Sequence, residues 1–140
     1  MVISLANAHS PRYTSALVWL RRDLRAHDHA ALYHALKNCG QVFVCFVFDS
    51  DVLAALPRVD RRVEFIVSSL ADVNTALQQM AQAAALPHAA QVQLLVRHGS
   101  ARELIPKLAA TLGVQAVFAN QEYEPAAIAR DSQVRGSLAN

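Results

Sequence analysis

Glycine and cysteine are scarce in this chain. Four glycines in 140 residues leave little material for a glycine-lined phosphate loop, and no Walker, GxGxxG or GxSxG pattern is present. The two cysteines, Cys39 and Cys45, form neither a CxxC pair nor a disulfide framework. We expect both thiols to be reduced, and Cys45 to be a small buried hydrophobic side chain.

Long hydrophobic runs and blocks of one charge are also missing. The longest apolar run, Val42 to Phe48, is far shorter than the ~20 residues of a membrane-spanning helix. The N-terminus lacks the basic region and apolar stretch of a secretory signal, so we expect a cytoplasmic protein. Thirteen basic and eleven acidic residues alternate in sign along the chain, and this pattern does not indicate a nucleic-acid-binding surface.

Hydrophobic residues, by contrast, make up 54% of the chain, enough for one domain with its own core. Residues 1–15 show no sustained period and are expected to be a loose leader. The domain is therefore expected to span residues 16–140. Four apolar segments predict buried strands, at 17–20, 41–49, 91–97 and 114–119.

Helical patterns separate and follow these strands. The first helix is expected to be capped by Asp28 and stopped by Gly40. A long helix of ~24 residues follows Pro57 to Asp60 and continues until Pro87. Ser100 to Glu103 matches a capping box, but Pro106 predicts that this third helix begins a few residues later. The last helix is expected from Pro125, at its first position, to Ala139.

Strands that alternate with helices predict an α/β fold. We expect a doubly wound, Rossmann-like parallel sheet of the 3-2-1-4-5 type, with right-handed crossovers and helices on both faces. Ligands of such sheets bind beyond the carboxyl ends of the strands, where the strand order reverses. In this order, the loop after the first strand and the loop after the fourth strand face one another.

These two loops are rich in charge. The first is Arg21-Arg-Asp-Leu-Arg25, directly after a buried strand, and the second is Asn120-Gln-Glu-Tyr-Glu-Pro125. Their charges predict a crevice that holds an anionic ligand or a second domain. The candidate residues are Arg21, Arg22, Asp23, Arg25, Asp49, Asn120, Glu122, Tyr123 and Glu124. A simpler explanation stays open, in which Arg21 pairs with Asp23, or Arg25 with Asp28, as surface ion pairs worth ~0–1 kcal/mol each.

Other chemistry is not indicated. The sequence His27-Asp-His29 has no further His or Cys at a zinc spacing, so we predict a helix cap rather than a metal site. Glu122 and Glu124 lack a nucleophile or an adjacent base. We therefore predict neither catalytic residues nor metal ligands.

Several spaced motifs resemble one known family. Trp19-Leu-Arg-Arg-Asp-Leu-Arg25, followed by His27-Asp-His-Ala-Ala-Leu32, is similar to the N-terminal signature of the DNA photolyase and cryptochrome family. The resemblance continues in Val47-Phe-Asp49, in Arg61-Arg62 with Phe65 and Leu70, and in Asn120 to Pro125 followed by Arg130-Asp131. His29 stands where the family usually has Asn. The motifs cover the chain from Ala16 to its end.

The resemblance implies a function for the domain. Photolyases join an N-terminal α/β domain, which holds a light-harvesting antenna pigment, to a helical domain that holds FAD. That helical domain binds damaged DNA, and the whole protein is a carbon–carbon lyase. This chain matches the first domain alone, so it is expected to bind an antenna and to dock on the helical domain, without FAD, DNA or catalysis of its own. Members usually add a fifth strand after the helix in which this chain stops, so one sheet edge is expected to be unpaired and the fragment can self-associate.

The identity of the antenna stays open between a deazaflavin, a flavin and a folate. In folate-using members the turn after the Tyr-Glu pair supplies an Asn and a Glu, where this chain has Ala126 and Ala127. These offer no side-chain hydrogen bonds, which disfavours folate. Three other functions also stay open: the same domain of a cryptochrome photoreceptor, a stand-alone nucleotide-binding module, and a docking scaffold without a ligand.

Overall fold

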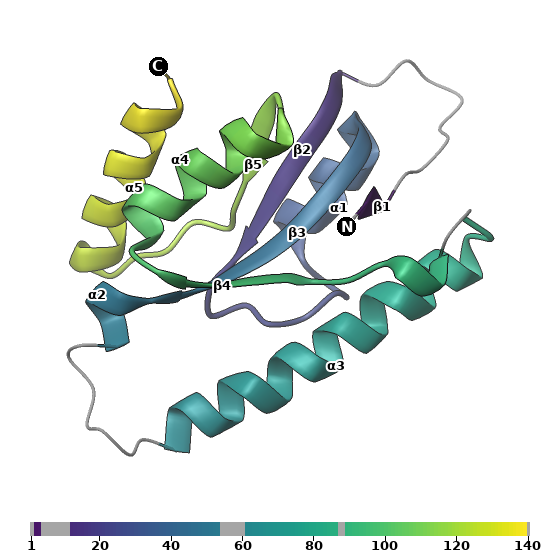
Figure 1. Cartoon of the computed structure of the whole chain (residues 1–140), viewed down its shortest axis with the longest axis horizontal. Helices are drawn as coiled ribbons and strands as arrows, with labels where there is room; N and C mark the ends of the chain where they lie inside the picture. Colours follow the sequence, from purple (N-terminus) through teal and green to yellow (C-terminus); the bar gives the residue numbers. More distant parts are fainter. Residues whose placement is uncertain (1, 4–11, 54–60, 87–88, 140) are drawn as a thin grey trace.

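The computed structural model describes residues 2–3, 12–53, 61–86 and 89–139. The strands of these residues are β1 (Val2–Ile3), β2 (Tyr13–Leu20), β3 (Cys39–Asp49), β4 (Leu95–Gly99) and β5 (Ala116–Phe118). The helices are α1 (Ala30–Asn38), α2 (Ser50–Leu53), α3 (Arg61–Ala83), α4 (Ala101–Leu112) and α5 (Pro125–Leu138), with a 3-10 turn η1 at Ala89–Gln91. Figure 1 shows strands and helices alternating along the chain.

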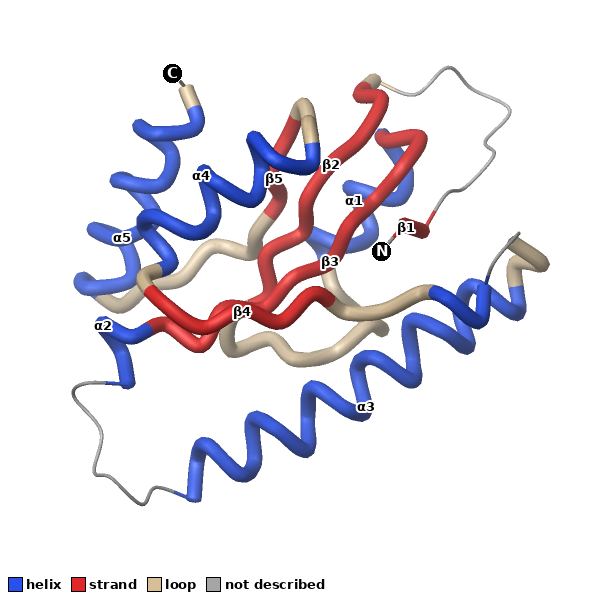
Figure 2. Tube along the Cα trace, viewed as in Figure 1, coloured by secondary structure: helices blue, strands red, loops and turns tan. Residues whose placement is uncertain are grey.

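The sheet has the predicted doubly wound topology. Strand β3 lies beside β2 and β4, and β2 also pairs with β5, with all three pairs parallel (Figure 2). The order β4-β3-β2-β5 is the first four strands of the predicted 3-2-1-4-5 arrangement, which is confirmed. The order reverses between β2 and β5, as the sequence predicted. Within the described residues β5 pairs only with β2, so its outer edge is free of a strand.

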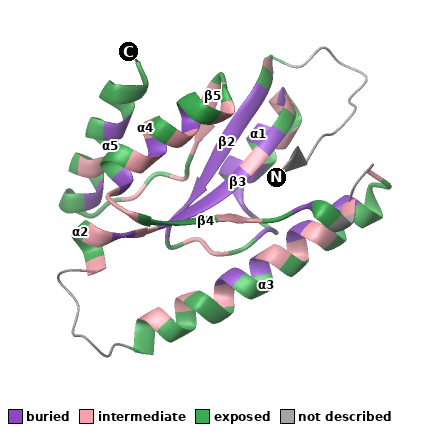
Figure 3. Ribbon diagram, viewed as in Figure 1, coloured by how far each residue is buried: buried purple, intermediate pink, exposed green. Residues whose placement is uncertain are grey.

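Helices cover both faces of the sheet. Alternate residues of β2 point to opposite faces, because successive side chains of a strand do so. Val18 packs in a core with residues of α1 and α3, whereas Leu17 and Trp19 pack in a second core with α4 and Val134 of α5. Both faces of β2 are therefore buried, which explains its continuous apolar sequence (Figure 3).

The N-terminal part is more ordered than the sequence predicted. Strand β2 begins at Tyr13, four residues before the strand that was predicted from Leu17. Val2 and Ile3 form β1, which pairs antiparallel with Phe43 and Val42 of β3. Residues 4–11 of the expected leader lie outside the described residues.

The fourth strand along the chain is shifted from its prediction. Residues 91–97 were expected to be a strand, but β4 runs from Leu95 to Gly99. Two side chains of α3 hold the preceding segment: Asn74 accepts a hydrogen bond from the Leu94 amide, and Gln78 donates to the Val92 carbonyl. In addition, β1 already occupies the edge of β3 that an earlier β4 would need.

Two of the predicted helix ends are wrong. Gly40 does not stop α1, because it lies within β3, which begins at Cys39. Helix α4 begins at Ala101 in spite of Pro106, and Ser100 makes no side-chain cap because its hydroxyl donates to Asp51 instead. The α3 helix, with 23 residues, and the Pro125 start of α5 agree with the prediction.

No helix in the described part of the chain has the length and hydrophobicity to cross a membrane. Both cysteines are free and buried, and the burial of Cys45 was predicted from the sequence. Burial raises the pKa of the Cys45 thiol to about 12, and it also raises the pKa of Cys39.

The buried thiols give a test of the core. Because the thiolate is the reactive form, Cys45 is expected to resist alkylation by iodoacetamide at pH 8 in the native protein and to react at the ordinary rate in urea. Mass spectrometry of the labelled chain measures this. Fast labelling of Cys45 in the absence of denaturant would contradict its position between β2 and β4.

Candidate functional site

Arg21 joins the two predicted loops. It follows β2 directly, and its side chain is 6% exposed. One guanidinium nitrogen lies 2.8 Å from Asp131 Oδ1 on α5, and another donates to the carbonyl of Asn120 after β5. Its Nε lies 3.6 Å from Glu122 Oε1. The loops after β2 and β5 therefore meet at the switch point, as the sequence predicted, and a buried guanidinium holds them together.

A second arginine completes this arrangement. Arg130 of α5 lies 3.1 Å from Glu122, 3.4 Å from Asp131 and 3.7 Å from Asp49 at the end of β3. The guanidinium carbons of Arg21 and Arg130 stack over the ring of Trp19, 4.6 and 5.1 Å from its centroid. We call the following six residues the Trp19 cluster: Trp19, Arg21, Asp49, Glu122, Arg130 and Asp131. They connect the carboxyl ends of β2 and β3 to α5.

Two buried atoms of the Trp19 cluster lack a hydrogen bond within the described residues. They are Nε of Arg21 and Oδ2 of Asp49. Arg21 Nε still faces Glu122. Asp49 Oδ1 accepts hydrogen bonds from the Asp51 amide at 3.1 Å and the Ala101 amide at 3.5 Å, whereas its Oδ2 has only the 3.7 Å approach of Arg130.

Asp23, His29 and Asn120 form a second connection between the loops. His29 Nδ1 accepts a hydrogen bond from the Leu32 amide, so its Nε2 carries the proton and faces Asp23 Oδ2 at 2.7 Å. Asn120 donates to the same Asp23 oxygen at 2.7 Å and accepts from the Ala31 amide at 2.9 Å. The first turn of α1 is thus capped from both loops.

This geometry corrects the predicted cap. His29, not Asp28, is the N-cap of α1, and Asp28 adopts a positive φ of 48°. The imidazole turns inward and is completely buried. Both ring nitrogens already have partners, so His29 has no free nitrogen for a metal. Within the described residues no three side chains of His, Cys, Asp or Glu gather at a metal site.

The same contacts fix the ionisation of Asp23. Burial alone would raise the pKa of this carboxyl. Hydrogen bonds from His29, from the Arg21 amide and from Asn120 outweigh burial, and the pKa lies well below its ordinary value of 3.8. Asp23 is therefore a charged structural anchor at neutral pH.

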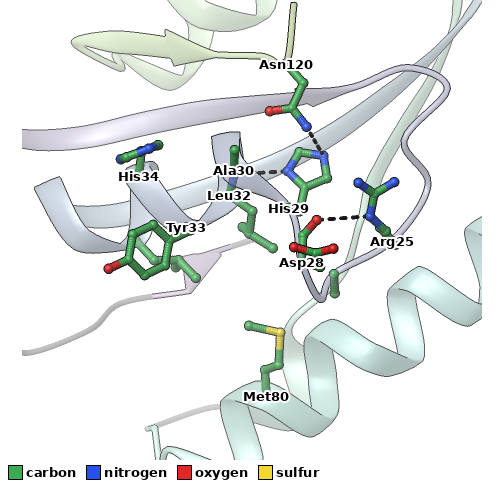
Figure 4. A pocket seen from close by; sticks show the side chains of 11 residues that line it. Arg25, Asp28, His29, Ala30, Leu32, Tyr33, His34, Met80 and Asn120 are labelled. Carbon is green, nitrogen blue, oxygen red and sulfur yellow. Dashed lines mark hydrogen bonds between the residues drawn. The ribbon is translucent and has the colours of Figure 1, made fainter.

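A hollow of about 510 Å³ opens beside these contacts. In Figure 4 it lies between the start of α1 and Met80 of α3, with Arg25 and Asp28 at one side and Tyr33 at the other. Arg25 donates from Nε to the Asp28 carbonyl rather than to its carboxylate. Neither of the simple surface pairs considered from the sequence forms, because Asp23 accepts from the Arg21 amide and not from its guanidinium.

The predicted residues therefore fall into groups. Arg21, Asp49 and Glu122 belong to the Trp19 cluster, and Asp23 and Asn120 form the second connection. Arg22 and Glu124 make an exposed ion pair of 2.7 Å on the outside. Tyr123 projects with 82% exposure, and Arg25 borders the hollow.

Three residues that connect the two loops were not among the candidates from the sequence. They are His29, Arg130 and Asp131. The pair Arg130-Asp131 was visible in the sequence as a motif, but only the packing of α5 against the end of β2 shows that it reaches Arg21. No simple pattern marks a buried histidine cap.

Comparison with known proteins decides the family. The model of the DNA photolyase family matches residues 16–140. The chain belongs to the DNA photolyase family. It is 33% identical over 122 residues to a deoxyribodipyrimidine photo-lyase of Synechococcus, covering 87% of this chain and 23% of that protein. It is also 30% identical over 130 residues to a cryptochrome DASH of Gloeobacter violaceus, covering 89% of this chain and 24% of that protein.

The fold comparison agrees. The structure of a photolyase from Sulfolobus tokodaii, described with two FAD molecules and a novel light-harvesting cofactor, superposes with a TM-score of 0.74 at 26% identity. The match covers 90% of this chain and 27% of that structure. This photolyase-family chain thus corresponds to the N-terminal α/β domain and spans about a quarter of the length of these relatives.

The Asp23 anchor of this photolyase-family domain can be tested by pH. Its depressed pKa contributes stability above the ordinary value near pH 4, and this contribution is lost as the pH falls toward the folded-state value. We expect Asp23→Asn to lower the free energy of unfolding by about 2 kcal/mol at pH 7, and the difference from the parent chain to shrink below about pH 4. Urea unfolding at several pH values measures it.

Asp28→Asn is the matched control. Asp28 is exposed, and Asn tolerates its positive φ well. It should unfold like the parent chain at every pH. An Asp23→Asn effect that is equally large at pH 3 and pH 7 would show that charge is not the cause.

Proposed function

We propose that this domain holds a light-absorbing antenna chromophore at the carboxyl edge of its sheet, within a longer photolyase. The observation that carries the proposal is the meeting of the loops after β2 and β5 at the switch point, held by Arg21. This is the part of a doubly wound sheet where ligands bind. The light-harvesting cofactor of the Sulfolobus tokodaii protein, which shares this fold, supports it.

A deazaflavin or a flavin fits the residues better than a folate. Ala126 is exposed and Ala127 is buried at the start of α5, and neither side chain can form the hydrogen bonds that the family's folate-using members supply there. The exposed Tyr123 lies in the same loop and offers an aromatic face for stacking.

The proposed partner is an FAD-binding helical domain of the same longer protein. Helix α3 offers a docking surface at its start, because its buried residues begin only at Leu70. Before this point Phe65 and Val67 are exposed, at 72% and 55%. Large exposed apolar side chains of this kind mark interaction surfaces. Binding of damaged DNA, and the choice between repair and light signalling, belong in this proposal to the partner domain.

A stand-alone nucleotide-binding module is less well supported. Such modules hold phosphate at helix N-termini on this edge of the sheet. Here the Ala31 and Leu32 N–H groups in the first turn of α1 donate to Asn120 and His29, and the Ala101 N–H at the start of α4 donates to Asp49. Protein side chains already occupy the positions that a phosphate would take.

The antenna proposal is tested by pigment content. We expect the chain, or its longer parent, to retain a pigment that absorbs in the near ultraviolet or blue after mild purification. Charge reversal of Arg22 or Arg25 should lower the pigment-to-protein ratio by up to about fivefold, the scale of an exposed ion pair, while the unfolding midpoint is nearly unchanged. Absorption spectra measure the ratio.

Lys107→Glu on the exposed face of α4 is the control and should leave pigment content unchanged. A parent protein without any such pigment would overturn the antenna proposal. Tight calorimetric binding of ATP or ADP to the same chain would favour the nucleotide-binding module instead.

A further inference from the structure

The imidazole of His29 fits its surroundings in one protonation state only. Its side chain is completely buried, and both ring nitrogens have partners. Nδ1 accepts a hydrogen bond from the Leu32 amide at 3.1 Å, and Nε2 faces Asp23 Oδ2 at 2.7 Å. A neutral imidazole has one N–H donor and one acceptor nitrogen, whereas an imidazolium has two donors and no acceptor. These contacts therefore require the neutral ring with its proton on Nε2.

A second proton, on Nδ1, breaks the cap of α1. The new N–H group points at the Leu32 N–H group, so two donors face each other without an acceptor. His29 is the N-cap of α1, and the loss of an N-cap hydrogen bond weakens the first turn of a helix. Asp23 cannot replace this bond, because it lies at Nε2.

Asp23 is the charged group that pairs with this ring in the described part of the chain. Its carboxylate stays ionised at pH 5, because its pKa lies well below the ordinary value, and it therefore attracts an imidazolium. Asn120, from the loop after β5, approaches Nε2 at 3.4 Å and is neutral. The other charged or titratable residues among those that line the adjoining hollow are all exposed: Arg25, Asp28, Tyr33 and His34.

The hollow beside His29 leaves room for the ring or the helix turn to move. It has a volume of about 510 Å³, enough to admit water, and Met80 of α3 borders it without adding a charge (Figure 4). The same first turn of α1 carries the Ala31 amide, which donates to Asn120 at 2.9 Å. A shift of this turn therefore also weakens the contact between α1 and the loop after β5.

We propose that His29 is an acid-sensitive helix cap. Uptake of a proton at Nδ1 releases the Leu32 amide and loosens the first turn of α1 together with its contact to Asn120. Histidine is the side chain that ordinarily titrates between about pH 5 and pH 8. In this range the pH controls how firmly the loops after β2 and β5 are joined on the α1 side. The inference does not depend on the antenna function, because it concerns contacts within the chain.

Amide hydrogen exchange in the full 140-residue chain tests the cap. Protection factors are used, because they are corrected for the direct effect of pH on exchange. We expect the protection factor of Leu32 to fall about tenfold between pH 7.5 and pH 5, the size of one lost cap bond. Ile105 of α4, in the core on the other face of the sheet, should keep its protection within about twofold. Unchanged protection of Leu32 would overturn the proposal, and so would an equal fall at Ile105, which shows opening of the whole domain.

Two variants identify the group that titrates. His29→Asn keeps a cap, because the Asn side-chain oxygen accepts a hydrogen bond and takes up no proton in this range. The protection of Leu32 should then be independent of pH. His27→Asn is the matched control, since His27 is exposed in the same loop, and it should show the same fall as the parent chain. A fall that persists in His29→Asn would contradict the assignment.

The parent chain alone decides the matter if His29→Asn does not fold. Nitrogen NMR shifts of the imidazole distinguish the neutral ring with its proton on Nε2 from the doubly protonated ring. Protonation of Nδ1 over the same pH range in which Leu32 loses protection would support the proposal. A ring that stays neutral down to pH 5, or that gains its second proton without a change at Leu32, would overturn it.

Discussion

The buried guanidinium of Arg21 is the contact on which the carboxyl edge of this domain depends. It follows the central strand β2, donates hydrogen bonds to Asp131 and to the Asn120 carbonyl, and lies 3.6 Å from Glu122. All three partners belong to the β5–α5 segment. A side chain this long can span the gap where the strand order reverses, and its planar fork can serve several acceptors at once. The abrupt change from an apolar strand to a run of charge therefore has a structural reason.

Two groups of side chains connect the loops at this edge of the sheet. On the α1 side, Asp23, His29 and Asn120 bond to one another and cap the helix. On the α5 side, the Trp19 cluster has three carboxylates and two guanidinium groups, and Asp49 Oδ2 accepts no hydrogen bond within the described part of the chain. The first connection is satisfied by its own hydrogen bonds, whereas the second keeps an unsatisfied buried carboxylate oxygen within the described residues. Sites that are not fully satisfied cost stability and are typical of functional positions.

The fold could be predicted from the sequence because the helices and strands follow from local hydrophobic periodicity. The order of the strands then follows from general rules of α/β topology. The continuous apolar strands, the 23-residue α3 and the start of α5 at Pro125 follow from such patterns. The strand shift at β4 was not predictable, because it depends on competition with Val2 and Ile3 for the same edge of β3. Gly40 failed as a stop signal for a related reason, since pairing with β2 extends β3 backwards.

The location of the candidate site could be predicted from the sequence, but the ion pairs between its side chains could not. Strand order alone places the loops after β2 and β5 together, and the structure confirms it. Which acid meets which base depends on side-chain reach and on the position of α5, and so Asp131 rather than Asp23 pairs with the Arg21 guanidinium. His29 was invisible as a cap because imidazole rarely takes this role.

A double-mutant cycle between Arg21 and Asp131 tests the central claim most directly. Urea unfolding of Arg21→Gln, Asp131→Asn and the double variant gives their coupling energy, with the exposed pair Arg22 and Glu124 as the reference cycle. We predict a coupling of about 2 kcal/mol or more for the buried pair and below about 1 kcal/mol for the exposed pair. A buried-pair coupling no larger than that of the exposed pair would contradict the claim that Arg21 holds the two loops together.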